Sequence, residues 1–350
     1  MMVSLDASRL LAALFTRGWQ LEVLDVKAPN GLPAGIREQR LNEKVKKPPE
    51  IKPSATVLLL RTQSSHIEVL MTRRHGGMNF MAGLWVYPGG KVDSADMSPD
   101  ALGRLTPEAR VRCAQIVARG PMSRFPLEQS LGMFVAACRE TFEEIGVLLA
   151  HDAAGKPCPP ALIDQLQHHR KASIAAPESF IEMLVRHDLM IDASALVYWA
   201  HWITPSAAPK RFDTNFFAIP APQGQEIRID TSEATEWKWI EPTHALAAHD
   251  RDEFPLSPPT VLTLQEISNS FAAHGSLPSM LAAEGERQVA TVLPKAISGP
   301  TENFTLMPWH PDYHTAPGEG VPAGIDYPAH LLRLPGRVNR KHDFSGKPLP

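Results

Sequence analysis

Short apolar runs along the middle of the chain predict β-strands. Alternation of apolar and polar positions, bounded by turn-forming residues, is typical of such strands. The predicted strands are Ala55–Arg61, Ile67–Thr72, Leu84–Tyr87, Ala195–Thr204, Arg211–Ile219 and Thr235–Ile240. The first two are joined by the polar turn at residues 63–66, and the third ends at Pro88 and a glycine pair.

A helical period predicts one long amphipathic helix over Leu131–Ala150. At about 100° per residue, one arc of this segment is apolar and comprises Leu131, Phe134, Val135, Cys138, Phe142, Ile145 and Leu149. Other helices are expected over Pro107–Arg119, within residues 160–190, and from Pro242, since proline is common in a first helical turn. Strands, a long helix, further strands and a helix predict an α/β (α+β) fold, with a mixed sheet sandwiched between helices.

Composition changes divide the chain into three parts. Residues 1–50 form an N-terminal extension, residues 51–270 the folded domain, and residues 271–350 a Pro- and Gly-rich extension expected to be irregular and to pack on the domain. Residues 94–130 interrupt the domain as an insertion.

The side of the long helix opposite its apolar arc carries Arg139, Glu140, Glu143 and Glu144. Glu140 and Glu144 are four positions apart, and like charges at that spacing destabilise a helix by about 0.2–0.5 kcal/mol. A divalent cation would turn this repulsion into binding, and an all-oxygen site suits Mg²⁺ or Mn²⁺. The alternative is an ordinary solvated face.

A glycine turn upstream is the second part of the candidate site. Gly89 and Gly90 follow the apolar run Leu84–Tyr87, and glycine allows backbone conformations and close approaches that other residues cannot make. We expect this turn to lie beside the acidic helix and to help hold metal and phosphate together. An ordinary turn is the alternative.

These two segments resemble the Nudix hydrolase signature, G-x5-E-x7-R-E-U-x-E-E-x-G-U, where U is a bulky aliphatic residue. Residues 139–147 match its second half, with Phe142 at the first U position, and Gly90-Lys91-Val92-Asp93 resembles its opening. About 35 residues are inserted between the halves, and counting back from Arg139 places Leu131 where the early Glu belongs. The chain is similar in this to the branch of coenzyme A diphosphatases related to the animal peroxisomal enzyme.

The resemblance implies residue roles. Glu140, Glu143 and Glu144 would be metal ligands, with Glu143 and Glu144 the stronger candidates. Arg139 stays protonated, so it would orient a glutamate through a bidentate pair, unless it is merely solvated. Glu233, in the loop before a strand, would be a ligand or general base, with a solvated carboxylate as the alternative.

Substrate recognition rests on fewer signals. Arg73 and Arg74 end a strand before the glycine turn and could contact phosphates, or they could be solvated strand-end charges. Asn79 stands where the coenzyme-A motif of bacterial and fungal diphosphatases has an Arg. His201 and Trp202 are expected to be core residues, and His310 is expected to be neither ligand nor base.

Composition sets the outer bounds. A net charge of −3 gives no basic footprint for nucleic acid. No apolar segment approaches the ~20 residues that span a bilayer. Three cysteines without metal-type spacing favour reduced thiols and a cytoplasmic location. The sequence is compatible with a homodimer and specifies no oligomeric state.

The sequence thus predicts a Mg²⁺- or Mn²⁺-dependent Nudix diphosphatase acting on a small-molecule diphosphate. Coenzyme A or acyl-CoA is the first expectation, by resemblance alone. NADH or ADP-ribose is the enzymatic alternative, and a non-catalytic ligand-sensing domain is the alternative from another class.

Overall fold

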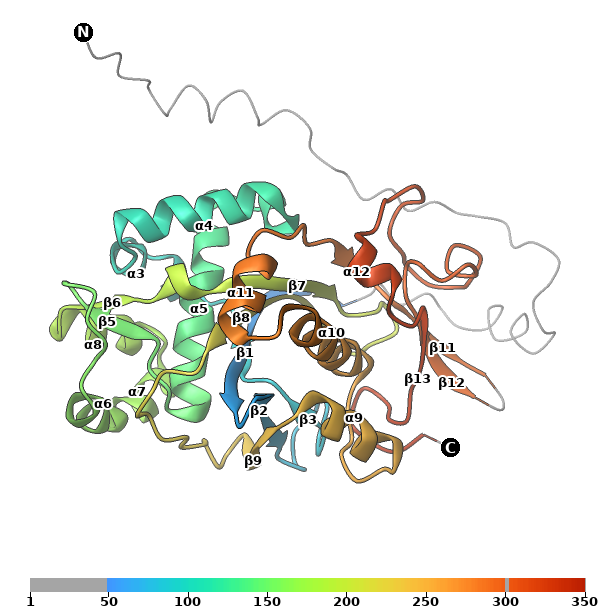
Figure 1. Ribbon diagram of the computed structural model, residues 1–350, viewed down its shortest axis with the longest axis horizontal. Helices are drawn as coiled ribbons and strands as arrows, with labels where there is room; N and C mark the ends of the chain where they lie inside the picture. The colour runs from blue at the N-terminus through green and yellow to red at the C-terminus, as the bar shows by residue number, and fades with distance from the viewer. Residues whose placement is uncertain (1–48, 300–301, 350) are drawn as a thin grey trace, which may run out of the picture.

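The computed structural model describes residues 49–299 and 302–349. An eight-stranded mixed sheet forms its centre (Figure 1). The strands of this sheet are β1 (Ile51–Gln63), β2 (His66–Arg74), β3 (Trp85–Val86), β4 (Gly89–Lys91), β7 (Val197–Ile203), β8 (Arg211–Pro220), β9 (Ala234–Ile240) and β10 (Thr291–Val292). β1 pairs in parallel with β8 and in antiparallel fashion with β2 and β4, so the sheet is mixed as predicted.

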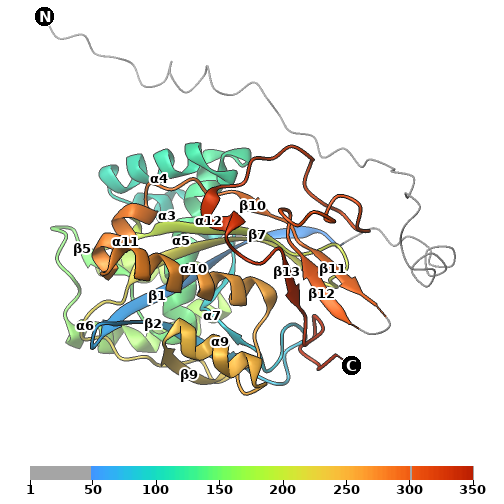
Figure 2. The same cartoon turned by 45° about the vertical axis from the view of Figure 1, so that its right-hand side comes forward.

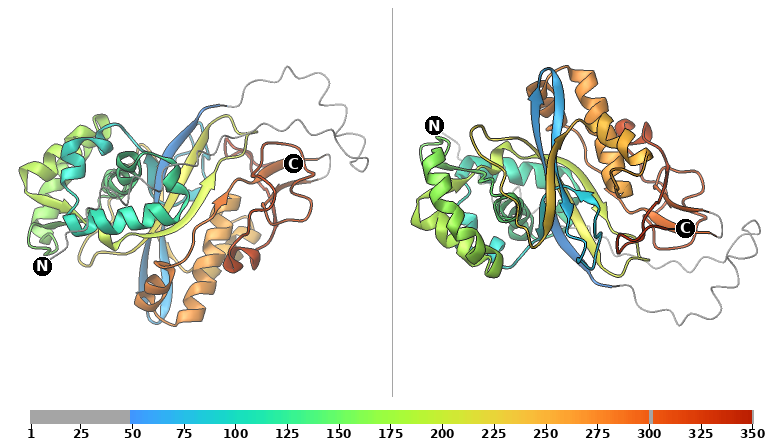
Figure 3. Two further views of the ribbon diagram at one scale, coloured as in Figure 1. Left: turned by 90° about the horizontal axis from the view of Figure 1, so that it is seen from above. Right: turned by 90° about the horizontal axis from the view of Figure 1, so that it is seen from below.

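Helices cover both faces of the sheet, as the two views in Figure 3 show. The helices are α3 (Pro99–Gly103), α4 (Pro107–Arg119), α5 (Leu127–Ile145), α6 (Pro160–Leu166), α7 (Arg170–Ala175), α8 (Glu178–Arg186), α9 (Pro242–Asp250), α10 (Pro258–His274), α11 (Leu277–Glu284) and α12 (Ala329–Leu332). Short 3₁₀ turns are η2 (Ala95–Met97), η3 (Pro121–Arg124), η4 (Gln167–His169) and η5 (Ala193–Ala195). None of the helices in the described ranges is long and apolar enough to cross a membrane.

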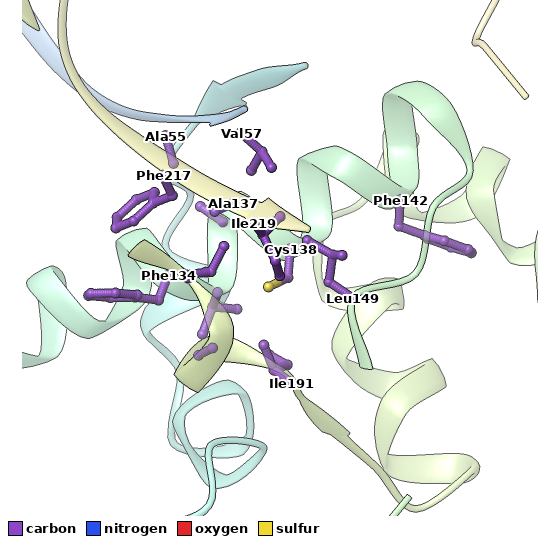
Figure 4. Close-up of a cluster of buried hydrophobic side chains, with 14 of the residues drawn as sticks. Ala55, Val57, Phe134, Ala137, Cys138, Phe142, Leu149, Ile191, Phe217 and Ile219 are labelled. Atoms are coloured by element: carbon purple, nitrogen blue, oxygen red, sulfur yellow. The ribbon is translucent and has the colours of Figure 1, made fainter. Parts of the chain in front are cut away.

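Alternation along β1 divides the core into two layers. Ala55 and Val57 belong to the cluster that packs around α5, shown in Figure 4, whereas Leu58 and Leu60 belong to the cluster under α10. Successive strand residues point to opposite faces, so one apolar strand serves both layers. The expected sandwich of a mixed sheet between helices is therefore confirmed.

The signature helix differs from the prediction at both ends. α5 begins four residues earlier, after Pro126, and ends at Ile145 instead of Ala150. Gly146 has φ 73°, the left-handed conformation that commonly ends a helix. The apolar pattern continues past Gly146 because Val147, Leu148 and Leu149 are buried, although they lie outside any helix or strand.

The C-terminal part is more regular than expected. β11 (Lys295–Ser298), β12 (Asn303–Leu306) and β13 (Arg337–Asn339) form a separate small sheet, visible beside α9 and α10 in Figure 2. α10 runs across residue 270 and β10 joins the large sheet, so the expected boundary at 270 does not mark the end of the packed body. Strands this short contain too few residues to show a period.

The expected extension at residues 1–50 lies almost wholly outside the described residues. The remaining strands, β5 (Ala150–Asp152) and β6 (Leu189–Ile191), pair with each other beside α5.

Candidate active site

Arg139 lies buried at the centre of the site. Its guanidinium makes a bidentate pair with Asp96, through Nε to Oδ1 at 2.8 Å and Nη2 to Oδ2 at 2.9 Å. Nη1 donates to Glu140 at 3.0 Å and to Glu143 at 2.8 Å, and Nη2 also donates to the Lys91 carbonyl. Burial by itself would lower the pKa of Arg139, but the hydrogen bonds to Asp96 and the charge of Glu140 outweigh burial and raise it. Arg139 is thus a fixed cation that orients carboxylates.

Asp96 was missed by the sequence analysis. It is fully buried, in the 3₁₀ turn η2, and burial raises the pKa of its carboxyl despite the pair with Arg139. Five residues separate Gly90 from Asp96, the same number as in the opening G-x5-E of the signature. Counting forward from Gly90 would therefore have found this carboxylate. Leu131, where the backward count placed the early Glu, is instead a buried apolar residue of α5.

Glu140 and Glu144 face the glycine turn of β4. The Gly89 amide donates to Glu144 Oε2 at 3.1 Å. A Cβ atom at Gly90 would lie 2.5 Å from the Glu140 carboxylate, and one at Gly89, where φ is 152°, would overlap the Ala55 carbonyl oxygen. The turn and the helix are therefore packed as closely as glycine allows.

Both carboxyls are hard to ionise in the protein alone. Burial raises the pKa of Glu140 to about 7. Burial raises the pKa of Glu144 well above its usual value, and the charges of Glu140 and Glu233 raise it further. A bound cation would reverse this effect, since a nearby positive charge favours the ionised carboxylate.

The donor set fits a divalent cation that is shared with a phosphate. In the described part of the chain, no three His, Cys, Asp or Glu side chains converge to hold a metal by themselves. Mg²⁺ is usually bound through one or two carboxylates plus substrate phosphates. Glu140 and Glu144 supply such a pair, and the oxygens not used by Arg139 and Gly89 remain available.

Glu143 has a different environment from the other two glutamates. Its Oε2 accepts from Arg139, and its Oε1 accepts a short hydrogen bond from the buried Ser173 hydroxyl of α7. Arg170, also on α7, donates to the Glu143 carbonyl at 2.8 Å. Because the protein already bonds both carboxylate oxygens, a ligand role for Glu143 stays a prediction. Ser173 is a further residue that the sequence analysis missed.

Glu233 lies half-buried in the loop before β9 and lines the same cavity as the α5 carboxylates. Its loop is held against the end of α5, because the Asp230 amide donates to the Glu144 carbonyl at 2.8 Å. The structure therefore brings Glu233 to the acidic pair, as the sequence analysis expected. Its role as general base stays a prediction.

The two arginines at the end of β2 point in different directions. Arg74 lines the cavity, its Nε donates to the Phe80 carbonyl, and its charge acts to lower the pKa of Glu144. Arg73 instead pairs with Glu236 on the neighbouring strand at 2.9 Å and does not line the cavity. Alternation along the strand separates the two side chains, so Arg73 is not brought to the substrate site.

The α5 glutamates, Glu233 and Arg74 line a cavity of about 660 Å³, within the usual size of small-molecule pockets. Its acidic end holds Glu140, Glu144 and Glu233, and its lining also includes Phe80, Phe212 and, near the C-terminus, Arg340, His342, Asp343 and Phe344. Trp202 lines it, whereas His201 is buried against Asp213 at 2.6 Å, and His310 is not part of it.

Comparisons with known sequences identify similar proteins. The family model described as the NUDT19 Nudix domain matches residues 44–267. The chain is 27% identical over 331 residues to "Acyl-coenzyme A diphosphatase NUDT19" of Xenopus laevis, and the match covers 86% of this chain and 87% of that protein. It is 28% identical over 227 residues to the human protein of the same name, covering 57% of this chain and 60% of that one.

A solved structure supports the fold alone. The crystal structure of a Nudix hydrolase from Alicyclobacillus acidocaldarius is similar with a TM-score of 0.52 and 24% identity, over 67% of this chain and 96% of that one.

Proposed function

This chain belongs to the NUDT19 Nudix domain family of hydrolases, and on that premise we propose that it cleaves the diphosphate of coenzyme A or acyl-CoA with Mg²⁺ or Mn²⁺. Nudix hydrolases generally use a divalent metal ion. The two relatives named above carry the name acyl-coenzyme A diphosphatase, which supports the substrate. Fold alone would not, because one fold serves many activities.

The observation that carries the proposal is the Glu140/Glu144 pair packed against the Gly89–Gly90 turn. Two half-buried carboxyls with raised pKa values ionise more readily beside a cation. The cation, when bound, would neutralise the diphosphate and lower the pKa of a coordinated water. Glu140 and Glu144 would hold it, and Arg139, itself held by Asp96, would keep Glu140 in place.

The reaction then needs a proton acceptor and a fixed diphosphate. Water adds its oxygen to one phosphorus, the bond from that phosphorus to the bridging oxygen breaks, and two phosphate monoesters leave. Glu233 would take the proton of the water, and Arg74 would balance the negative charge at the same end of the cavity.

A substrate panel tests this function. We expect turnover of coenzyme A and an acyl-CoA, and slower turnover of NADH or ADP-ribose, only when Mg²⁺ or Mn²⁺ is present. Products would be separated by chromatography and identified by mass. Preferential cleavage of NADH or ADP-ribose would make that compound the substrate in place of coenzyme A. Tight binding without any cleavage would favour the ligand-sensing alternative.

A matched pair of variants tests the site. Glu144→Gln should lower kcat at least about 100-fold, since metal charge stabilisation is worth several kcal/mol, with an unchanged circular-dichroism spectrum. Glu128→Gln, at an exposed position in the first turn of the same helix, is the control and should retain activity. Equal activity of both variants would remove Glu144 from the site.

A further inference from the structure

Residues 341–349 near the C-terminus form a hairpin, which we call the C-terminal hairpin. The Leu349 amide donates to the Lys341 carbonyl, and the Asp343 amide donates to the Lys347 carbonyl, both at 2.8 Å. At the turn, Asp343 Oδ1 accepts from the Ser345 amide at 2.8 Å and the Lys347 amide at 3.0 Å. The hairpin therefore has a defined shape of its own.

The tip of the C-terminal hairpin is docked on the loop that follows β2. The Met81 amide donates to the Phe344 carbonyl and the Ala82 amide donates to the Ser345 carbonyl, each at 3.0 Å. Gly346 has φ 95°, and a Cβ atom there would overlap the Ala82 carbonyl oxygen. Main-chain contact at the tip thus depends on Gly346 and places the hairpin along the wall of the cavity.

Two polar side chains of this wall each have a nitrogen without a hydrogen-bond partner among the described residues. Arg340 and His342 both line the cavity. Arg340 Nη2 donates to Ser298 at 2.8 Å and the guanidinium lies 5.2 Å from the Phe344 ring, which fixes its plane. Arg340 Nε and His342 Nδ1 are nevertheless buried, and neither has a hydrogen-bond partner among the described residues. A buried polar group without a partner is unfavourable, so these atoms point to a ligand.

The hydrogen-bond donors of this wall suit an anion. Asp343 also lines the cavity, but three groups of the hairpin turn, including the Ser345 hydroxyl, already donate to its Oδ1. Arg340 is a planar donor suited to phosphate. The anion bound here would be a second one, because the diphosphate has to meet the cation at Glu140 and Glu144.

A single loop connects the two ends of the cavity. Arg74 donates to the Phe80 carbonyl at one side of that loop and acts on the charge of Glu144. The next residue, Met81, is bonded to the C-terminal hairpin. A ligand with a diphosphate and a separate phosphate on the neighbouring sugar would place its two anionic groups at these two ends.

We propose that Arg340 and His342 form a subsite for the ribose 3′-phosphate of coenzyme A. The proposal rests on the proposed function and deepens it, because it assigns the nucleotide end of the substrate to the C-terminal hairpin and the residue that precedes it. It predicts that the enzyme distinguishes coenzyme A from 3′-dephospho-coenzyme A, which lacks only that phosphate.

The test compares kcat/KM for these two substrates. The wild type should prefer coenzyme A, and Arg340→Gln should lower kcat/KM for coenzyme A by roughly 10- to 100-fold. The same variant should change kcat/KM for 3′-dephospho-coenzyme A by less than about threefold. His342→Ala should act in the same direction with a smaller loss. Lys347→Ala removes an exposed charge of the same hairpin outside the cavity and should change neither value.

A binding measurement keeps the test independent of turnover and of any one variant. By calorimetry, adenosine 3′,5′-bisphosphate should bind the wild type more tightly than AMP, and Arg340→Gln should abolish the difference. Equal losses for both substrates, or no loss for coenzyme A, would overturn the subsite while leaving the proposed function in place. A wild type that cleaves neither substrate would overturn the proposed function itself.

Discussion

The pair between Asp96 and Arg139 can be tested by Asp96→Asn. The substitution keeps the volume of the side chain but removes its charge, and one of its two oxygens becomes a donor that faces Arg139. Asp96 is fully buried and Arg139 is 2% exposed, so solvent cannot replace the lost partner. Removing one partner of a buried ion pair costs about 3–5 kcal/mol.

The lower end of that range is expected here. Glu140 and Glu143 continue to pair with Arg139 after the change, so its charge stays partly compensated. A loss of about 3 kcal/mol is a large part of the 5–15 kcal/mol of a typical protein. It should lower the midpoint of thermal unfolding by roughly 5–10 °C. Since Arg139 also orients Glu140, kcat should fall as well.

Unfolding would be followed by circular dichroism, and Asp100→Asn is the control. Asp100 lies exposed in the same insertion, on α3, and its change should shift the midpoint by no more than about 2 °C. The double variant with Arg139→Gln should be less destabilised than the sum of the two single variants, because the pair is removed as a unit. A midpoint for Asp96→Asn equal to that of the control would refute the reasoning.

Three further predictions concern neighbouring groups. Gly90→Ala should leave the unfolding midpoint nearly unchanged but raise the metal concentration for half-maximal activity about tenfold, because its Cβ would displace the flexible Glu140 carboxylate. Ser173→Ala removes a hydrogen-bond donor to Glu143 and should lower the free energy of unfolding, measured with urea, by about 1–3 kcal/mol. It should also lower kcat. Burial raises the pKa of Glu266 from 4.5 to about 7, so the folded protein binds more protons between these values. The contribution of Glu266 to the free energy of unfolding is complete below about pH 4.5 and is lost as the pH rises through about 7. The free energy of unfolding of the wild type should therefore fall between pH 5 and 8, and Glu266→Gln should make that fall smaller by up to about 3 kcal/mol.

Each of these variants has a control at an exposed position. Gly103→Ala meets no atom within 4 Å, and Ser123→Ala and Glu302→Gln change exposed residues. Metal dependence that is equal in Gly90→Ala and Gly103→Ala would contradict the first prediction. The second would fail if Ser173→Ala were as stable as Ser123→Ala. If the free energy of unfolding of Glu266→Gln depended on pH in the same way as that of Glu302→Gln, the prediction for Glu266 would be ruled out.

The acidic helix face could be predicted because local spacing determines it. Glu140 and Glu144 share a side of α5 through helix geometry alone, and the glycine pair identified the facing turn. Asp96 could have been found by counting forward from Gly90, since it lies near the start of the insertion and keeps the spacing of the signature's opening.

The remaining parts of the site depend on contacts between distant segments. Ser173 reaches Glu143 from a short helix 30 positions away. Arg340 and His342 come from a Pro-rich segment without a period, and main-chain hydrogen bonds hold the C-terminal hairpin in place. No composition or spacing rule reports such contacts. The separation of Arg73 from Arg74 was in principle predictable from strand alternation, once the strand was extended to its last residue.

The part of the insertion that follows Asp96 has a consequence for divergence within such enzymes. Its apolar residues, among them Leu102, Cys113 and Ile116, pack into the layer behind α5, and no residue from 94 to 138 lines the cavity. Selection on this segment therefore acts through its fit to the back of the helix, and chemistry at the front imposes no constraint on it. We therefore expect this part of the chain to tolerate changes in length and sequence while the catalytic face stays the same.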